Sequence, residues 1–163
     1  MATIVLQKIG VARTISGNSP QILTLPEAAG TQAFKDGEFV YLSGGKVTEI
    51  GANPGIILGV AAQDASGTTN TAIKVYIANA DTIFFANKTD SSGTAAVTAY
   101  GDVGSVFGIY RDTSNNISHL YADAGTNARC IILDHDNRDT LADTGGRVLF
   151  QVAGNFRQMF STS

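Results

Sequence analysis

Residues 36–88 consist of short apolar stretches, each ended by a turn signal. We expect strands in five of these stretches, at 38–42, 46–50, 56–62, 71–77 and 82–86. Strands that follow one another at intervals of about ten residues are typical of a small antiparallel barrel or sandwich. No stretch of this region keeps an apolar period of 3.6 long enough for a helix. The sequence therefore predicts an all-β protein with a barrel-like core at 36–88.

The stretch at 38–42 indicates how that core is packed. Phe39 and Tyr41 alternate with Val40 and Leu42, so both faces of the expected strand are apolar. A strand of this kind is buried on both sides, whereas a strand with one solvated face alternates apolar and polar residues. We therefore expect this strand to lie between two layers of side chains.

The rest of the chain predicts further strands around the core. We expect them at 22–25, 95–97, 103–110, 117–122, 129–133 and 147–152. Residues 103–110 are expected to pair with 117–122, and residues 147–152 either pair with 155–160 or extend as a tail. Residues 26–29 are expected to begin a helical turn, and residues 1–10 form either a first strand or an extended arm. No linker is long enough to separate two domains, so residues 1–163 are expected to form one domain.

The charge content is low for a soluble domain. Asp, Glu, Lys and Arg make up 15% of the chain, against roughly 25% in a typical domain. This composition fits an ordinary β-protein with a Thr- and Asn-rich surface, or a subunit that buries much of its surface against neighbours. The net charge is −3 and no two of the 11 basic residues are adjacent, so we do not expect nucleic-acid binding.

The cysteine and the hydropathy pattern bear on the compartment. Cys130 is the only cysteine, and its apolar neighbours predict a buried structural thiol without a disulfide. The N-terminal residues lack the pattern of a signal peptide. No apolar run approaches the roughly 20 residues of a membrane span. We expect synthesis in the cytoplasm and no membrane partner.

The densest polar cluster lies at 134–139 and contains Asp134, Asp136 and Asp139. Alternating Asp and Asn ligands suit Ca²⁺, but the Gly and Glu of an EF-hand loop are missing from their positions. A strand-end turn with Asx caps accounts for the same residues, and both interpretations stay open. His119 and His135 are the only histidines, and no G-x-S-x-G elbow is present. We therefore expect neither an enzyme nor a cofactor.

The order of elements in the core resembles a known family. Asp36-Gly37-Glu38 leads into a strand, a Gly turn and a short partner strand; a strand ending in Gly59-Val60-Ala61, a loop and a strand at 73–77 follow. This order resembles the small β-barrel domains of the capsid decoration, or cement, proteins of tailed bacteriophages. Residues 133–139 and 143–148 also resemble C-terminal segments of phage structural proteins.

The resemblance implies a virion protein that binds the outside of an expanded icosahedral shell where several capsid subunits meet. Its partner would be the major capsid protein, and such proteins commonly assemble there as homotrimers. We expect contacts through Thr3, Ile4, Val5 and Leu6, which would add a strand to a neighbour's sheet edge. Phe156, Met159 and Phe160 would fill a subunit pocket. The alternative for both sets is that they form ordinary strands of the barrel.

Other classes of binding protein remain open. The chain could be a tail, baseplate or head-fibre component, or a carbohydrate-binding β-module. A glycan binder usually displays exposed aromatic side chains, and this chain has no Trp and only five Tyr. We expect all five, Tyr41, Tyr76, Tyr100, Tyr110 and Tyr121, to be strand residues.

Overall fold

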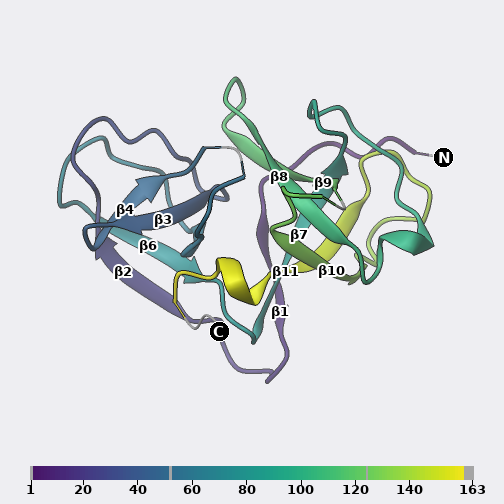
Figure 1. Cartoon of the computed structure of the whole chain (residues 1–163), viewed down its shortest axis with the longest axis horizontal. Coiled ribbons are helices and arrows are strands. Elements are labelled where there is room, and N and C mark those ends of the chain that lie inside the picture. Colours follow the sequence, from purple (N-terminus) through teal and green to yellow (C-terminus); the bar gives the residue numbers. More distant parts are fainter. Residues whose placement is uncertain (1, 52, 124, 160–163) are drawn as a thin grey trace.

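The computed structural model describes residues 2–51, 53–123 and 125–159, and it confirms the all-β class. Within these ranges the regular elements are eleven strands and two 3₁₀ turns. The strands gather in two lobes that lie side by side, with β2, β3, β4 and β6 in one lobe and β7 to β11 in the other (Figure 1).

The first lobe is a five-stranded antiparallel barrel. Its strands run in the order β2-β6-β5-β3-β4, and they are β2 (Ile22–Pro26), β3 (Phe39–Ser43), β4 (Lys46–Glu49), β5 (Gly59–Ala61) and β6 (Ala72–Ile77). A bridge between Glu27 and Val47 joins the end of β2 to β4 and closes the sheet. The hydrophobic core of this lobe consists of Phe34, Val40, Val47, Leu58, Ala61, Ile73, Val75 and Ile77.

The second lobe is a six-stranded sheet in the order β1-β7-β11-β10-β8-β9. Its strands are β1 (Gly10–Thr14), β7 (Thr82–Thr89), β8 (Val106–Asp112), β9 (Ile117–Ala122), β10 (Cys130–His135) and β11 (Arg147–Val152). The last two residues of β7 also pair in parallel with β9. Strands β7 to β11 therefore form a closed circuit, here called the ring, and β1 adds to the first half of β7.

The two lobes share one core. Phe39 of β3 and Val60 of β5 belong to the same buried cluster as Phe84, Phe107 and Phe150 of the ring. The centroids of the Phe39 and Phe150 phenyl groups lie 6.0 Å apart, within the range of favourable aromatic pairs. Because Val40 faces the barrel interior while Phe39 faces the ring, the prediction that this strand is covered on both sides is confirmed.

Four expected details of the strand arrangement are wrong. The first is the strand at 95–97, where the structure has only isolated bridges at Ala95 and Val97. The strand at 82–86 belongs to the ring rather than to the barrel, because β7 pairs with β1 and β11. Strand β2 takes the fifth place in the barrel by pairing with β6.

Strand β11 pairs with β10 and β7 instead of 155–160, and a 3₁₀ turn, η2 (Gly154–Phe156), follows it. Residues 26–29 form no helical turn, since Glu27 bridges to Val47. The expected pairing of 103–110 with 117–122 is confirmed as β8 with β9.

The C-terminal segment after η2 completes the wall of the barrel. The backbone of Ile57 donates to Phe156 O at 2.7 Å and accepts from Gln158 N at 2.8 Å. The side-chain amide of Gln158 bonds both backbone groups of Leu42, at 2.5 Å to its N–H and 2.7 Å to its carbonyl. Strand β5 pairs with β3 only at Phe39 and Val40, so Gln158 replaces the missing neighbour of Leu42.

Candidate interaction surfaces

The N-terminal arm, residues 2–8, lies against the segment that connects β10 to β11. Thr3 forms a parallel bridge with Thr144. Ile4 N donates to Thr144 O at 2.8 Å, and Thr144 N donates to Ala2 O at 2.9 Å. The residues expected to add to a neighbour's sheet therefore already pair, by one edge, with their own chain.

A buried amide on β7 anchors this arm. Asn87 is 1% exposed; its Oδ1 accepts from Gln7 N at 2.7 Å and its Nδ2 donates to Gly145 O at 2.6 Å. The same Nδ2 lies 3.5 Å from the carbonyl of Val5. One side chain thus joins the arm, the end of β7 and the segment next to Thr144. The expectations from the sequence did not include this role, although a polar Asn directly after the apolar residues of 82–86 was a signal for it.

The opposite edge of the arm faces outward. In a strand, successive residues direct their backbone groups to alternate sides. Because Ala2 and Ile4 bond Thr144, the N–H and C=O of Thr3 point away from it, and neither has a partner among the described residues. The Val5 side chain is 77% exposed on the same stretch. Ile4 and Leu6 are half-buried. The arm is therefore an extended segment, joined to Thr144 by one bridge, with free backbone groups on its outer edge and an exposed apolar residue.

The predicted C-terminal contact residues lie elsewhere. Phe156 packs against the shared core, with the Arg129 guanidinium 4.2 Å from its ring centroid. Met159 packs against the barrel interior, and Phe160 lies outside the described residues. The Phe156 and Met159 side chains contact their own chain, and the structure does not bring them together with the arm.

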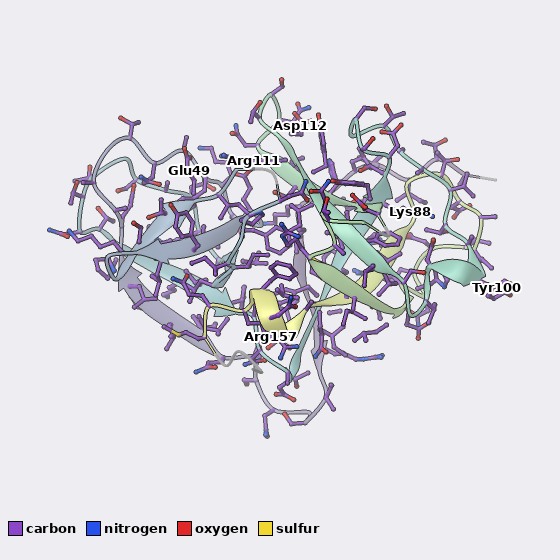
Figure 2. All side chains as sticks on the ribbon, viewed as in Figure 1. Glu49, Lys88, Tyr100, Arg111, Asp112 and Arg157 are labelled. Carbon is purple, nitrogen blue, oxygen red and sulfur yellow. The ribbon has the colours of Figure 1, made fainter. Side chains whose placement is uncertain are left out.

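A group of exposed apolar residues lies on the outer face of the ring. Tyr100 belongs to η1 (Tyr100–Asp102), and Figure 2 shows it at the far edge of the molecule. Together with Val103, Ile131 and Leu133 it forms what we call the outer-face patch. Their exposed fractions are 83%, 44%, 38% and 36%. The expectation that Tyr100 is a strand residue is wrong, because it lies in a 3₁₀ turn and its side chain is exposed. The sequence did not indicate Ile131 and Leu133, because apolar positions in a strand do not reveal which face stays uncovered.

Arginine side chains pair with two of the three carboxylates of the 134–139 cluster, while Asp134 accepts from the backbone N–H of His135. Asp136 is paired with Arg138, and Asp139 accepts from Arg147 Nε and Nη2 at 2.7 and 2.6 Å. These hydrogen bonds hold the pKa of both aspartates below the ordinary value. Among the ranges that the structure describes, no group of three or more His, Cys, Asp or Glu residues is placed to hold a metal ion. The geometry favours the interpretation of the cluster as a structural turn.

Other buried polar groups also serve the fold. Figure 2 shows Arg111 of β8 and Glu49 of β4 where the lobes meet; Arg111 Nε donates to buried Glu38 at 3.1 Å. Lys88 Nζ donates to Asp102 at 2.7 Å, and His135 Nε2 lies 2.8 Å from the carbonyl of Ala99. Each of these contacts connects segments far apart in the chain.

The remaining nucleophile and base candidates are buried. His119 is 1% exposed, and burial lowers its pKa. Cys130 is fully buried, as expected, and burial raises the pKa of its thiol.

Comparison of the chain with protein-family models, with curated proteins and with solved structures found no match in any of the three. No helix in the described part of the chain is long and apolar enough to cross a membrane.

Proposed function

We propose that the protein is a non-enzymatic structural component of a tailed-bacteriophage virion that binds the outer surface of the expanded capsid. The major capsid protein is its partner, and its role is to add contacts across the joints between shell subunits. The resemblance of residues 36–88 to capsid decoration proteins supports this proposal. A weakly charged two-lobed β-fold whose lobes share one core also suits a rigid connector.

The outward edge of the arm is the observation that carries the proposal. The free N–H and C=O of Thr3 can bond an extended segment of a shell subunit, which would continue the small sheet formed by the arm and Thr144. Main-chain bonds of this kind supply affinity, and the exposed Val5 side chain supplies a specific contact. Asn87 holds the arm in place beforehand, which lowers the entropy lost on binding.

Repetition would make such contacts effective. Copies that self-associate as homotrimers around a joint would combine several modest contacts into strong retention. The first experiment is quantitative mass spectrometry of purified particles from the source, which compares the amount of this protein with that of the major capsid protein. A fixed stoichiometric ratio to the shell subunit is expected. A much smaller amount would assign the protein to the tail or a vertex, and absence from particles would refute the virion proposal.

A proline at position 3 tests the arm edge directly. Thr3→Pro removes the outward N–H but leaves the inward bond from Ile4 N to Thr144 O. Binding to undecorated expanded shells is expected to weaken about tenfold or more. Thr3→Ser keeps the N–H and serves as the matched control. Shell binding by Thr3→Pro equal to that of the unchanged protein would show that this edge is not the contact.

A further inference from the structure

A hollow on the second lobe crosses four neighbouring strands. Strands β1, β7, β11 and β10 lie in that order in the sheet. Gly10 of β1 pairs with Phe85 of β7, which pairs with Leu149 of β11. Leu149 in turn pairs with Asp134 of β10. The hollow has a volume of about 240 Å³, and Phe85, Leu149 and Asp134 line it. The two apolar side chains therefore form its middle, and the carboxylate lies on its β10 side.

Two β-bulges shape the sides of the hollow. The register of β1 shifts between Val11 and Arg13, and Val11, Ala12 and Arg13 all line the hollow. In a regular strand, successive side chains would point to opposite faces of the sheet. The register of β10 shifts in the same way between Ile132 and Asp134. Bulges re-aim side chains and are frequent next to functional sites. The backbone itself therefore places Arg13 and Asp134 at the hollow.

Arg13 and Asp134 bring opposite charges to the two sides of the hollow. Both residues are exposed, and neither forms an ion pair with any described residue. Neighbouring strands are about 4.8 Å apart, so the backbones of β1 and β10 are separated by roughly 14 Å. Asp134 Oδ1 accepts from His135 N at 2.8 Å, which leaves Oδ2 for a ligand. An open cation and an open anion thus lie on either side of one apolar middle.

The other two charged side chains of the hollow neutralise each other. Arg138 Nε donates to Asp136 Oδ1 at 2.9 Å, and Asp136 is 5% exposed. The Arg138 guanidinium also lies 4.6 Å from the centroid of the Phe85 phenyl group. This pair is held against the sheet and adds no net charge. The charges that select a ligand are therefore those of Arg13 and Asp134.

We propose that the hollow binds an ω-amino acid, a zwitterion in which an alkyl chain separates a carboxylate from an ammonium group. The carboxylate accepts from Arg13, and the ammonium group donates to Asp134. The alkyl chain covers the apolar middle, and a ligand with only one charge would leave the opposite charge of the hollow without a partner. A C-terminal lysine presents the same two groups at the same spacing. The hollow uses none of the arm residues, so this inference does not depend on the proposed function.

Methyl NMR of the full chain tests the proposal, with ε-aminocaproate as the probe. Millimolar ε-aminocaproate is expected to shift the methyl signals of Val11 and Leu149, while those of Ile22, an exposed residue of the barrel, should not move. Caproate lacks the ammonium group, and hexylamine lacks the carboxylate. Each of these two compounds is expected to bind about fivefold more weakly than ε-aminocaproate.

A short peptide that ends in lysine separates the two sources of this chemistry. Binding of the peptide with a free C-terminal carboxylate, but not of its amidated form, would identify the end of another polypeptide as a ligand. Binding of ε-aminocaproate without binding of either peptide would identify a free ω-amino acid.

Substitutions at the two open charges test their roles. Arg13→Gln and Asp134→Asn are each expected to weaken binding of ε-aminocaproate about fivefold. Asp134→Asn keeps the oxygen that accepts from His135 N. Lys74→Gln, at an exposed basic residue of the barrel, should leave binding unchanged. Arg13→Glu gives the hollow a second open carboxylate and is expected to reverse the preference, so that the diamine cadaverine binds more tightly than ε-aminocaproate.

Three results would overturn the proposal. The first is the absence of shifts at Val11 and Leu149 with ε-aminocaproate. The second is binding of caproate or hexylamine as tight as that of ε-aminocaproate, because a single charge would then be sufficient. The third is an unchanged preference for ε-aminocaproate over cadaverine in Arg13→Glu, which would remove Arg13 from recognition.

Discussion

Removal of Arg111 tests how the two lobes are held together. This residue of β8 reaches across to the barrel, where it donates to Glu38 at 3.1 Å and to the carbonyl of Ile50 at 2.9 Å. The Glu38 side chain is 2% exposed, and that of Arg111 is 14% exposed. Arg111→Met would fill most of the same space but leave the Glu38 carboxylate buried without its cationic partner.

The structure sets the size of the effect. Breaking a buried ion pair by removing one partner destabilises a protein by roughly 3–5 kcal/mol. Glu38 keeps the bond from Lys35 N at 2.8 Å, so we expect the lower end, about 3 kcal/mol. For a chain of this size that loss lowers Tm by about 6–12 °C. Combining Arg111→Met with Glu38→Gln removes the buried charge as well, and the double variant should lose only about 1 kcal/mol.

Urea unfolding of the two single variants and the double variant measures these differences. The midpoints should shift while the m value stays constant, because the surface exposed on unfolding is unchanged. An Arg111→Met loss below about 1 kcal/mol would contradict the assigned role of the pair. A double variant as unstable as Arg111→Met alone would show that lost packing, rather than an unpaired carboxylate, is the cause.

Three further predictions concern single side chains. Asn87→Ala should destabilise the protein by about 2–3 kcal/mol and raise hydrogen exchange in residues 2–8 but not in β1; an unchanged arm would contradict its anchoring role. Gln158→Ala should lose about 1–2 kcal/mol in urea unfolding, and Gln158→Glu at least as much, because its second carboxylate oxygen would oppose the Leu42 carbonyl; unchanged stability of both variants would refute the role of Gln158 as a partner of β3. Burial holds the pKa of His119 in the folded protein below its ordinary value of 6.5. As the pH drops below 6.5, His119 is therefore protonated in the unfolded chain before it is protonated in the folded protein, and the free energy of unfolding falls. His119→Gln should reduce that slope in unfolding curves recorded across this window, and an unchanged slope would rule His119 out as its source.

The positions of the strands were largely predictable, because alternation and turn residues are local signals. The expected strands at 117–122 and 147–152 match β9 and β11 in full, and the two apolar faces of 38–42 correctly indicated two layers of packing. The assignment of strands to sheets was not predictable in this way. Strand β7 follows β6 closely in sequence, yet it pairs with β1 and β11, which come from opposite ends of the chain.

The candidate surfaces were predictable only in part. Thr3 and Val5 were expected in either a first strand or an extended arm, but the residue that anchors this segment, Asn87, bonds Gln7 from 80 positions away. The outer-face patch depends on which faces of the ring the loops leave uncovered, and local apolar patterns contain no such information. Met159, expected to reach a neighbour, packs against the barrel interior of its own chain.

The hydrogen bonds of the Gln158 side chain to Leu42 of β3 have a consequence for folding during synthesis. The barrel strands lie between residues 22 and 77, yet the amide that satisfies Leu42 belongs to residue 158. A ribosome releases the chain from the N-terminus, so Leu42 of the barrel lacks these two hydrogen bonds until residue 158 has left the ribosome. A nascent chain, or one truncated before residue 158, would present the unpaired backbone groups of Leu42 to other molecules, and the associated risk of aggregation ends only when residue 158 is released.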